Sequence, residues 1–323
     1  MTSPNLSEVI TTTLRNRSKK LADNMSDNNA ILMRLKERGR IKPFSGGRTI
    51  VQELMYADNS TYKRYSGYEA LNISPSDVLT AAEFDIKQAA IAVSISGLEM
   101  LQNSGEEAVI DLLESRIENA EFTFMNNLSA DMYSAGTADG GKQIGGLQLL
   151  VADTPTSGTV GGIDRASYSF WQNQTYDAST DGGTAATATN IQRYMNSMYV
   201  EVVRGNDGPD LILSDNNYYL LYLSSLQTIQ RITNEKMAQA GFQNLKYMGA
   251  DVVLDGGIGG NCPANHMYFL NTRYIHYRPH RDRNMVPLDP RRYSTNQDAM
   301  VELMGWAGNM TLSNAFLQGV LKA

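Results

Sequence analysis

Residues 104–134, SGEEAVIDLLESRIENAEFTFMNNLSADMYS, contain the strongest structural signal in the sequence. Apolar residues recur at steps of three and four from Val109 to Met132, a spacing that places them on one face of a single long helix. Ser104 and Glu107 have the spacing of a capping box, so the helix should begin at Ser104. About thirty residues at about 1.5 Å each predict a helix of roughly 45 Å, against which a sheet can pack.

The segment ahead of this helix, residues 48–73, changes to a β pattern. Two runs, RTIVQELMYA and TYKRYSGYEALNI, are separated by a polar turn near Asp58 and predict a long hairpin. An isolated pair of strands is only marginally stable in water, and tyrosine presents a large apolar face with a polar tip. We therefore expect the hairpin to rest on another surface, and a hairpin packed on its own domain is the alternative. The side chains expected at that contact are Leu54, Tyr56, Tyr62, Tyr65 and Tyr68.

The first 48 residues form a basic arm. They carry ten Lys and Arg residues against four Asp and Glu residues, a net charge of +6, whereas the rest of the chain carries −12. Helical spacing from Leu6 to Leu21 and from Ala30 to Arg38 predicts two short helices that cannot form a core of their own. Such an arm indicates an anionic partner, either nucleic acid or an acidic protein surface, and a solvated amphipathic helix is the alternative. The basic side chains expected to meet the partner are Arg15, Arg17, Lys19 and Lys20.

Regular elements alternate with glycine-rich loops in the rest of the chain. Apolar spacing predicts helices around residue 98, over 189–204, and from 214 to about 240. Strands are expected at 81–96, 210–214, 250–254, 267–271, 274–278 and 300–321. Because helices and strands are mixed without a regular βαβ alternation, the sequence predicts an α+β fold.

The sequence contains no set of residues arranged for catalysis, cofactor binding or metal binding. His276 and His280 flank Pro279 in a strand-like stretch, so they do not share a helix face as two zinc ligands would. The basic cluster at 278–283 is expected to pair with acids of a neighbouring chain or to be solvated. Cys262 is the single cysteine, which excludes an intrachain disulfide. No uncharged apolar run approaches the roughly 20 residues that span a bilayer, so no membrane association is expected.

The order of these elements resembles the major capsid proteins of tailed double-stranded DNA bacteriophages, which have the Hong Kong 97 type of fold. Four local stretches are also similar to that family: residues 143–148, QIGGLQ; Asp164-Arg165 ahead of Trp171; residues 209–213, PDLIL; and residues 305–309, GWAGN. The resemblance implies an N-terminal arm at 1–44, an extended E-loop at 45–74, a peripheral domain at 75–139 with its spine helix at 104–134, an axial domain at 140–272, and a return to the peripheral domain at 273–323.

The resemblance also implies a function and a set of partners. The chain would be a structural subunit, without enzymatic activity or cofactor, that forms the pentamers and hexamers of an icosahedral capsid around double-stranded DNA. It would be made in the host cytoplasm and reside in the virion, with the basic arm facing the interior. Since only some forty residues precede the hairpin, the resemblance implies a separate scaffolding protein or assembly without one. A portal and a decoration protein are further partners implied by the family.

Three alternatives stay open at this point. An encapsulin-like shell of a cellular nanocompartment shares the fold, but it need not carry a basic arm facing nucleic acid. An enzyme such as a hydrolase would need a set of catalytic side chains that this sequence does not contain. A stand-alone nucleic-acid-binding protein would explain the arm, but its strongly acidic body would oppose broad contact with DNA.

Overall fold

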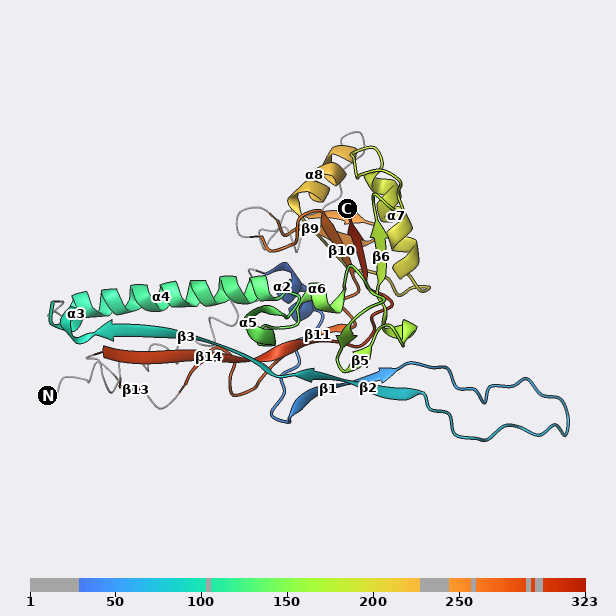
Figure 1. Ribbon diagram of the computed structural model, residues 1–323, viewed down its shortest axis with the longest axis horizontal. Helices are drawn as coiled ribbons and strands as arrows, with labels where there is room; N and C mark the ends of the chain where they lie inside the picture. Colours follow the sequence, from blue (N-terminus) through green and yellow to red (C-terminus); the bar gives the residue numbers. More distant parts are fainter. Residues whose placement is uncertain (1–28, 103–105, 227–243, 257–259, 289–291, 294–298) are drawn as a thin grey trace.

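The computed structural model describes residues 29–102, 106–226, 244–256, 260–288, 292–293 and 299–323. They form an elongated base, a second body that stands on the base, and a hairpin that projects away from both (Figure 1). Helices and sheets are mixed throughout, which agrees with the α+β class predicted from the sequence.

The base is built on α4 (Glu106–Asp131), which lies along the antiparallel strands β3 (Lys87–Ser96) and β14 (Ala299–Leu312) (Figure 1). The helix has 26 residues and is therefore about 39 Å long. Its predicted apolar stripe is buried in the described part, at Ile117, Ala120, Phe124, Leu128 and Met132. The long helix is thus confirmed. Ser104 lies outside the described residues, so the capping box stays a prediction.

Strand β14 is central to the base because four other strands pair with it. They are β3, β11 (Ile275–Pro279), β12 (Val286–Pro287) and β13 (Arg292–Tyr293). Alternate side chains of β14 enter the core, where Trp306 stacks on Tyr277 with ring centroids 5.9 Å apart. This one strand therefore connects every strand of the base sheet.

The second body contains a six-stranded sheet in the order β6-β15-β10-β7-β9-β8. Helices α7 (Ile191–Val202) and α8 (Asn216–Ser225) share a core with alternate side chains of this sheet. The buried residues of α7 are those that its periodicity predicted: Ile191, Tyr194, Met195, Met198 and Val202. The strands are β6 (Gln174–Asp177), β7 (Leu211–Ser214), β8 (Asn244–Tyr247), β9 (Ala250–Leu254), β10 (His266–Leu270) and β15 (Gly319–Lys322).

Residues 299–322 belong to both bodies. After β14 the chain turns at 313–318 and enters β15, which lies between β6 and β10 inside the six-stranded sheet. The single β segment predicted at 300–321 is therefore wrong, because these residues form two strands in different sheets. Short elements complete the fold: α3 (Gly97–Gln102), α5 (Ala138–Gly141), α6 (Leu147–Leu150), β4 (Thr159–Val160), β5 (Ile163–Asp164) and a 3-10 turn (Ser169–Trp171).

The predicted hairpin exists, but its second strand lies elsewhere. β1 (Thr49–Met55) pairs with β2 (Leu79–Asp85), so the strand expected at 61–73 is wrong. Residues 56–78 form a long loop between the two strands. The pairing partner is 79–85 because its alternate residues Ala82 and Phe84 are buried in the core together with Ile50 and Leu54 of β1. The apolar tyrosine-rich run 61–73 has no such buried face.

Helix α2 (Ala30–Glu37) is packed on the body and not free, which corrects part of the predicted arm. It begins at Asn29, whose side chain accepts hydrogen bonds from two N–H groups of the first turn. Its apolar face is buried in the main core at Ala30, Ile31, Leu32 and Leu35. The following residues run parallel to β11, with bridges from Ile41 to Tyr277 and from Phe44 to His280. Residues 1–28, including the first predicted helix, lie outside the described residues.

Candidate assembly interface

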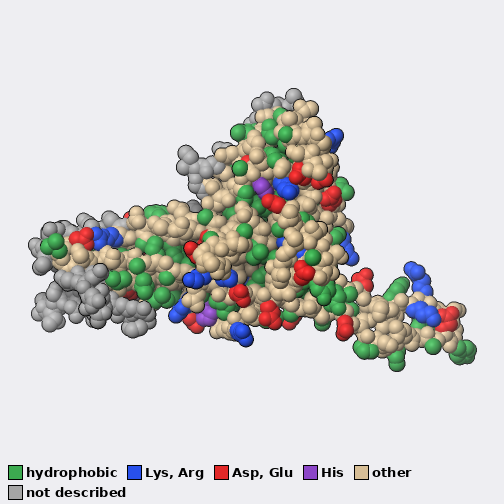
Figure 2. All heavy atoms as spheres, viewed as in Figure 1, with side chains coloured by type: hydrophobic (Ala, Val, Ile, Leu, Met, Phe, Trp, Pro, Cys, Tyr) green, Lys and Arg blue, Asp and Glu red, His purple; other side chains and the backbone are tan. Residues whose placement is uncertain are grey.

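The loop at 56–78 presents large apolar side chains to solvent. The exposed fractions of Tyr62 and Ile73 are 78% and 93%, and Tyr68 is fully exposed. Figure 2 shows hydrophobic side chains along this projecting segment. Full burial of one such side chain is worth about 1.5–3 kcal/mol. Burial of several such side chains against another surface would therefore be strongly favourable.

A few polar contacts hold the two halves of the loop together. The hydroxyls of Ser60 and Ser76 lie 2.7 Å apart, and the Lys63 ammonium lies 3.1 Å from the Glu69 carboxylate. Both charged side chains are about half exposed, so this ion pair adds little to stability. The loop shape therefore depends on few contacts, as expected of a segment that is completed by a partner.

Of the five side chains predicted at an intermolecular contact, four lie in the loop and Leu54 lies in β1. Tyr62, Tyr65 and Tyr68 are exposed and available to a partner. Tyr56 is partly covered, because its ring lies 5.3 Å from that of Phe170. Leu54 is only 3% exposed and belongs to the core of its own chain. The assignment of Leu54 to an intermolecular contact is therefore wrong, since the side chain on this face of β1 points inward.

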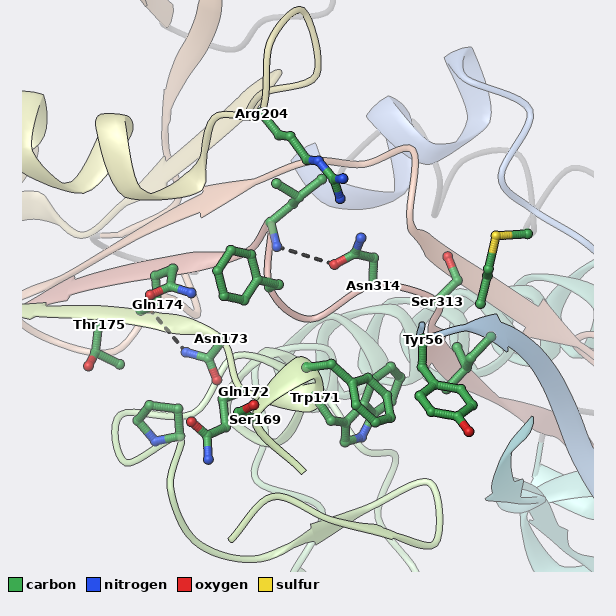
Figure 3. Close-up of a pocket in the computed structure, with 16 residues that line it drawn as sticks. Tyr56, Ser169, Trp171, Gln172, Asn173, Gln174, Thr175, Arg204, Ser313 and Asn314 are labelled. Atoms are coloured by element: carbon green, nitrogen blue, oxygen red, sulfur yellow. Dashed lines mark hydrogen bonds between the residues drawn. The ribbon is translucent and has the colours of Figure 1, made fainter. Parts of the chain in front are cut away.

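A groove of about 600 Å³ lies at the root of the hairpin (Figure 3). Tyr56 and Trp171 lie on one side of it, and Arg204 and Asn314 lie on the other. Amide side chains of the segment Gln172–Gln174 form much of the floor, and Phe316 on the rim is half exposed. No pattern in the sequence indicates this groove, because it joins the segments 54–56, 169–175 and 313–317, which are more than a hundred residues apart.

A buried charge cluster fixes α2 to the second body. The Arg34 guanidinium lies 3.1 Å from the Asp210 carboxylate and 3.3 Å from that of Asp251, and it also donates to the Asp210 carbonyl oxygen at 2.9 Å. Arg38 adds a more exposed contact to Asp210 at 3.3 Å. Because Asp251 is almost fully buried, Arg34 supplies a charge that this carboxylate needs. Periodicity alone placed Arg34 on a helix and gave no indication of this role.

Further ionisable groups lie where the two bodies meet. Tyr133, just after α4, donates a hydrogen bond to Asp255, just after β9, and burial raises the pKa of Tyr133 well above its usual value. Burial, with the nearby Asp215 and Asp255 carboxylates, also raises the pKa of the Cys262 thiol. A thiol of raised pKa is a weak nucleophile, so Cys262 has no feature of a reactive cysteine.

His266 joins β10 to the loop that follows α6. Its Nε2 atom lies 3.0 Å from Asp153 Oδ2, and its Nδ1 atom lies 2.7 Å from the Ala264 carbonyl oxygen. Both neighbours are acceptors, which favours the doubly protonated ring. Burial lowers the pKa of His266, but the hydrogen bonds to Asp153 and Ala264 outweigh burial and raise it overall. The same hydrogen bond lowers the pKa of Asp153.

The described residues contain no group of three or more His, Cys, Asp and Glu side chains placed to hold a metal ion. His276 is buried in β11, and the His280 ring packs edge-on against Phe44 with centroids 5.0 Å apart. No helix in the described part of the chain is both long and apolar enough to cross a membrane. The basic residues Arg15, Arg17, Lys19 and Lys20 lie outside the described residues.

Neither a family model nor a curated protein matches the sequence. Solved structures do match the fold. The cyanophage A-1(L) capsid subunit has a TM-score of 0.63 at 17% identity, and the alignment covers 88% of this chain and 90% of that one. The capsid protein of Myoviridae phage XM1 has a TM-score of 0.52 at 11% identity and covers 90% and 91% of the two chains.

An encapsulin matches as well. The SrpI encapsulin of Synechococcus elongatus PCC 7942 has a TM-score of 0.52 at 8% identity, and the alignment covers 91% of this chain and 88% of that one. Phage capsids and an encapsulin shell thus match over nearly the whole chain. The chain therefore has the fold of these capsid and encapsulin shell subunits.

Proposed function

We propose that this chain is the major capsid protein of a tailed double-stranded DNA bacteriophage. It is a structural subunit, not an enzyme, and it assembles into the pentamers and hexamers of an icosahedral shell. One observation carries the proposal: on a shell-protein fold, the hairpin projects from the body with Tyr62, Tyr65 and Tyr68 exposed. Such a surface is explained by a neighbouring copy that covers it.

The parts of the molecule take the corresponding roles in a Hong Kong 97-type subunit. The base, with α4 as spine helix, is the peripheral domain, and the body with the six-stranded sheet is the axial domain. The E-loop, expected at 45–74, extends in this assignment through β2 to Asp85, because β2 is the strand that pairs with β1. Within the N-terminal arm, expected at 1–44, α2 is docked on the body.

The hairpin of one subunit would reach over an adjacent subunit and hold the shell together. The groove at the hairpin root is suited to receive the neighbouring chain, because it combines half-exposed aromatic rings with many amide groups that can pair with a backbone. The arm ahead of α2, through Arg15, Arg17, Lys19 and Lys20, would face the interior and meet DNA or a scaffolding protein. Portal and decoration proteins are the remaining expected partners, and the virion is the expected location.

The direct test is electron microscopy of the purified protein, expressed alone and with its scaffold where the genome encodes one. We expect closed shells, capsomers or tubes that sediment far above the 35.6 kDa monomer. A second sample lacks residues 58–76, so that β1, β2 and the Tyr56 contact remain. It should keep the circular dichroism spectrum of the parent and lose the shells. A stable monomer under all conditions would overturn the proposal.

A matched substitution tests the groove separately. Phe316→Ser removes a half-exposed ring from the rim, whereas Leu220→Ser removes a similarly exposed side chain from α8. The proposal expects fewer or less heat-resistant shells for Phe316→Ser and wild-type shells for Leu220→Ser. If the two variants formed shells of equal number and heat resistance, the groove would not be part of the interface.

The second candidate function is an encapsulin-like nanocompartment shell, which the SrpI match supports. The net charge of +6 in residues 1–48 favours the phage capsid, since an anionic genome has to be accommodated. The two functions predict particles with different contents. Particles isolated from the native source should contain nuclease-protected double-stranded DNA if the chain is a capsid protein, and a protein cargo if it is an encapsulin.

A further inference from the structure

Two basic segments that are far apart in the sequence lie side by side in the structure. The residues after α2 run parallel to β11: the Lys42 N–H donates to the Tyr277 carbonyl, and the Tyr277 N–H donates to the Arg40 carbonyl, at 2.9 and 3.2 Å. The pairing continues with the Arg281 N–H donating to the Phe44 carbonyl at 2.9 Å. Five cationic side chains are thereby collected on one strand pair and the turn that follows it. We call them the basic seam: Arg40, Lys42, Arg278, Arg281 and Arg283.

None of the five has a hydrogen bond or ion pair from its side chain to any described residue. Lys42, Arg281 and Arg283 are exposed, and the inner Nε atoms of Arg40 and Arg278 are shielded from solvent without a partner. The one acid in the two segments is Asp282. In contrast, Arg34, Arg116 and Lys322 elsewhere in the described chain all pair with carboxylates. Within the part of the chain that the structure describes, the basic seam is thus a concentration of positive charge in which no side chain is paired with a carboxylate.

The positive charges of the seam also act on His276, which is buried in β11. Burial together with the positive charges of Lys42, Arg40 and Arg278 lowers the pKa of His276 to about 4. The ring is therefore neutral at physiological pH, and the charge of the seam is carried by its Lys and Arg side chains. In Figure 2, Lys and Arg side chains with a His among them gather along the lower edge of the molecule, with a few acidic side chains beside them.

We propose that the basic seam binds the phosphate backbone of double-stranded DNA without regard to sequence. The inference rests on the proposed function, in which the chain encloses a DNA genome. Five cations of one sign suit a polyanion, because duplex DNA carries a negative charge about every 1.7 Å of its axis. A carboxylate of a neighbouring copy would neutralise one or two of them and leave the rest uncompensated. Arg and Lys contacts to phosphates supply affinity and not base specificity.

The test compares the salt dependence of DNA binding by assembled shells or capsomers of three full-length proteins. The seam variant is Lys42→Gln, Arg281→Gln, Arg283→Gln, and the wild type is the reference. The control removes three exposed cations elsewhere: Lys142→Gln, Arg193→Gln and Lys246→Gln. A short fluorescent duplex of arbitrary sequence is the probe, and its dissociation constant is measured over a range of sodium chloride concentrations.

The slope of log affinity against log salt changes by about 0.9 for each phosphate contact. The seam variant should therefore lose about two to three from the wild-type slope and still form normal shells, while the control keeps the wild-type slope. An equal loss in both triple variants would overturn the inference, because the effect would then be general charge. Loss of shells with unchanged DNA binding would also overturn it and assign the seam to an acidic surface of a neighbouring copy. If the wild type forms no shells, the proposed capsid function fails. The salt slopes of the three proteins, measured on capsomers or free protein, then still show whether the basic seam contacts DNA.

Discussion

Replacing Arg34 by methionine should release α2 from the second body. Methionine preserves most of the length of the side chain but removes the charge that faces Asp210 and Asp251. Asp210 keeps other partners in this variant: Arg38 lies 3.3 Å from its carboxylate, and Thr272 donates its N–H and its hydroxyl to it, each at 2.7 Å. Asp251, with 3% of its side chain exposed, loses the Arg34 charge.

The expected cost follows from this difference between the two carboxylates. Removing one partner of a buried ion pair lowers the free energy of unfolding by about 3–5 kcal/mol. Because Asp210 keeps its other partners, we expect the loss in Arg34→Met near the lower end of this range, at about 3 kcal/mol. That free energy corresponds to a change of about a hundredfold in the equilibrium for undocking α2. Arg38→Met is the matched control, because that side chain is half exposed and its ion pair is worth about 0–1 kcal/mol.

Amide hydrogen exchange read by mass spectrometry measures the undocking directly. Protection of Ala30–Glu37 should fall about a hundredfold in Arg34→Met and less than about fivefold in Arg38→Met, with α7 unchanged. Adding Asp251→Asn to Arg34→Met should restore part of the protection, because the buried charge is gone. Equal protection in the two single variants would refute the reasoning that Arg34 holds α2 through a buried charge.

Three other predictions concern separate regions. The His266–Asp153 pair should stabilise the fold most between about pH 4 and 6.5. Because the pKa of His266 is raised, its contribution to stability is complete below 6.5 and is lost as the pH rises through the raised value. Because the pKa of Asp153 is lowered, its contribution is present above 3.8 and is lost in stronger acid. Thermal denaturation of wild type and His266→Gln across this range checks it, and parallel curves would contradict it. Gly146→Ala should cost at least about 1–3 kcal/mol, since an added Cβ would lie 2.4–2.5 Å from backbone atoms at the end of α4; urea denaturation measures the loss. Lys63 should form no covalent cross-link, because it is half exposed and paired with a carboxylate in a polar setting, so mature particles should give a single monomer band on a denaturing gel and a ladder would disprove this.

Elements with a local apolar period could be predicted from the sequence. The buried residues of α7 were predicted correctly because each turn of Ile191–Val202 places an apolar side chain on the same face. α4 followed from the same rule. The second strand of the hairpin could not be placed, because a tyrosine-rich run and the run at 79–85 have similar strand propensity. The choice between them depends on packing against Gly161, whose carbonyl accepts the Glu83 N–H at 2.9 Å.

Interactions between distant segments were not predictable from one sequence. Arg34 and Asp210 are 176 positions apart, so nothing local distinguishes Arg34 from the other basic residues of the arm. The groove and the basic seam likewise depend on pairings across the whole chain. By contrast, an apolar excess on a thin segment is visible in the sequence, and Tyr62, Tyr65 and Tyr68 are indeed exposed in the single chain. Their contact with a neighbouring subunit stays a prediction.

The position of residues 299–322 has a consequence for biosynthesis. They supply the central strand of the base and an interior strand of the second body, and they are translated after all the elements that they join. While they remain in the ribosome, neither sheet is complete, so a nascent chain lacks a finished core in both bodies. Completion of both sheets is therefore a late folding event, because it waits until residues 299–322 have left the ribosome.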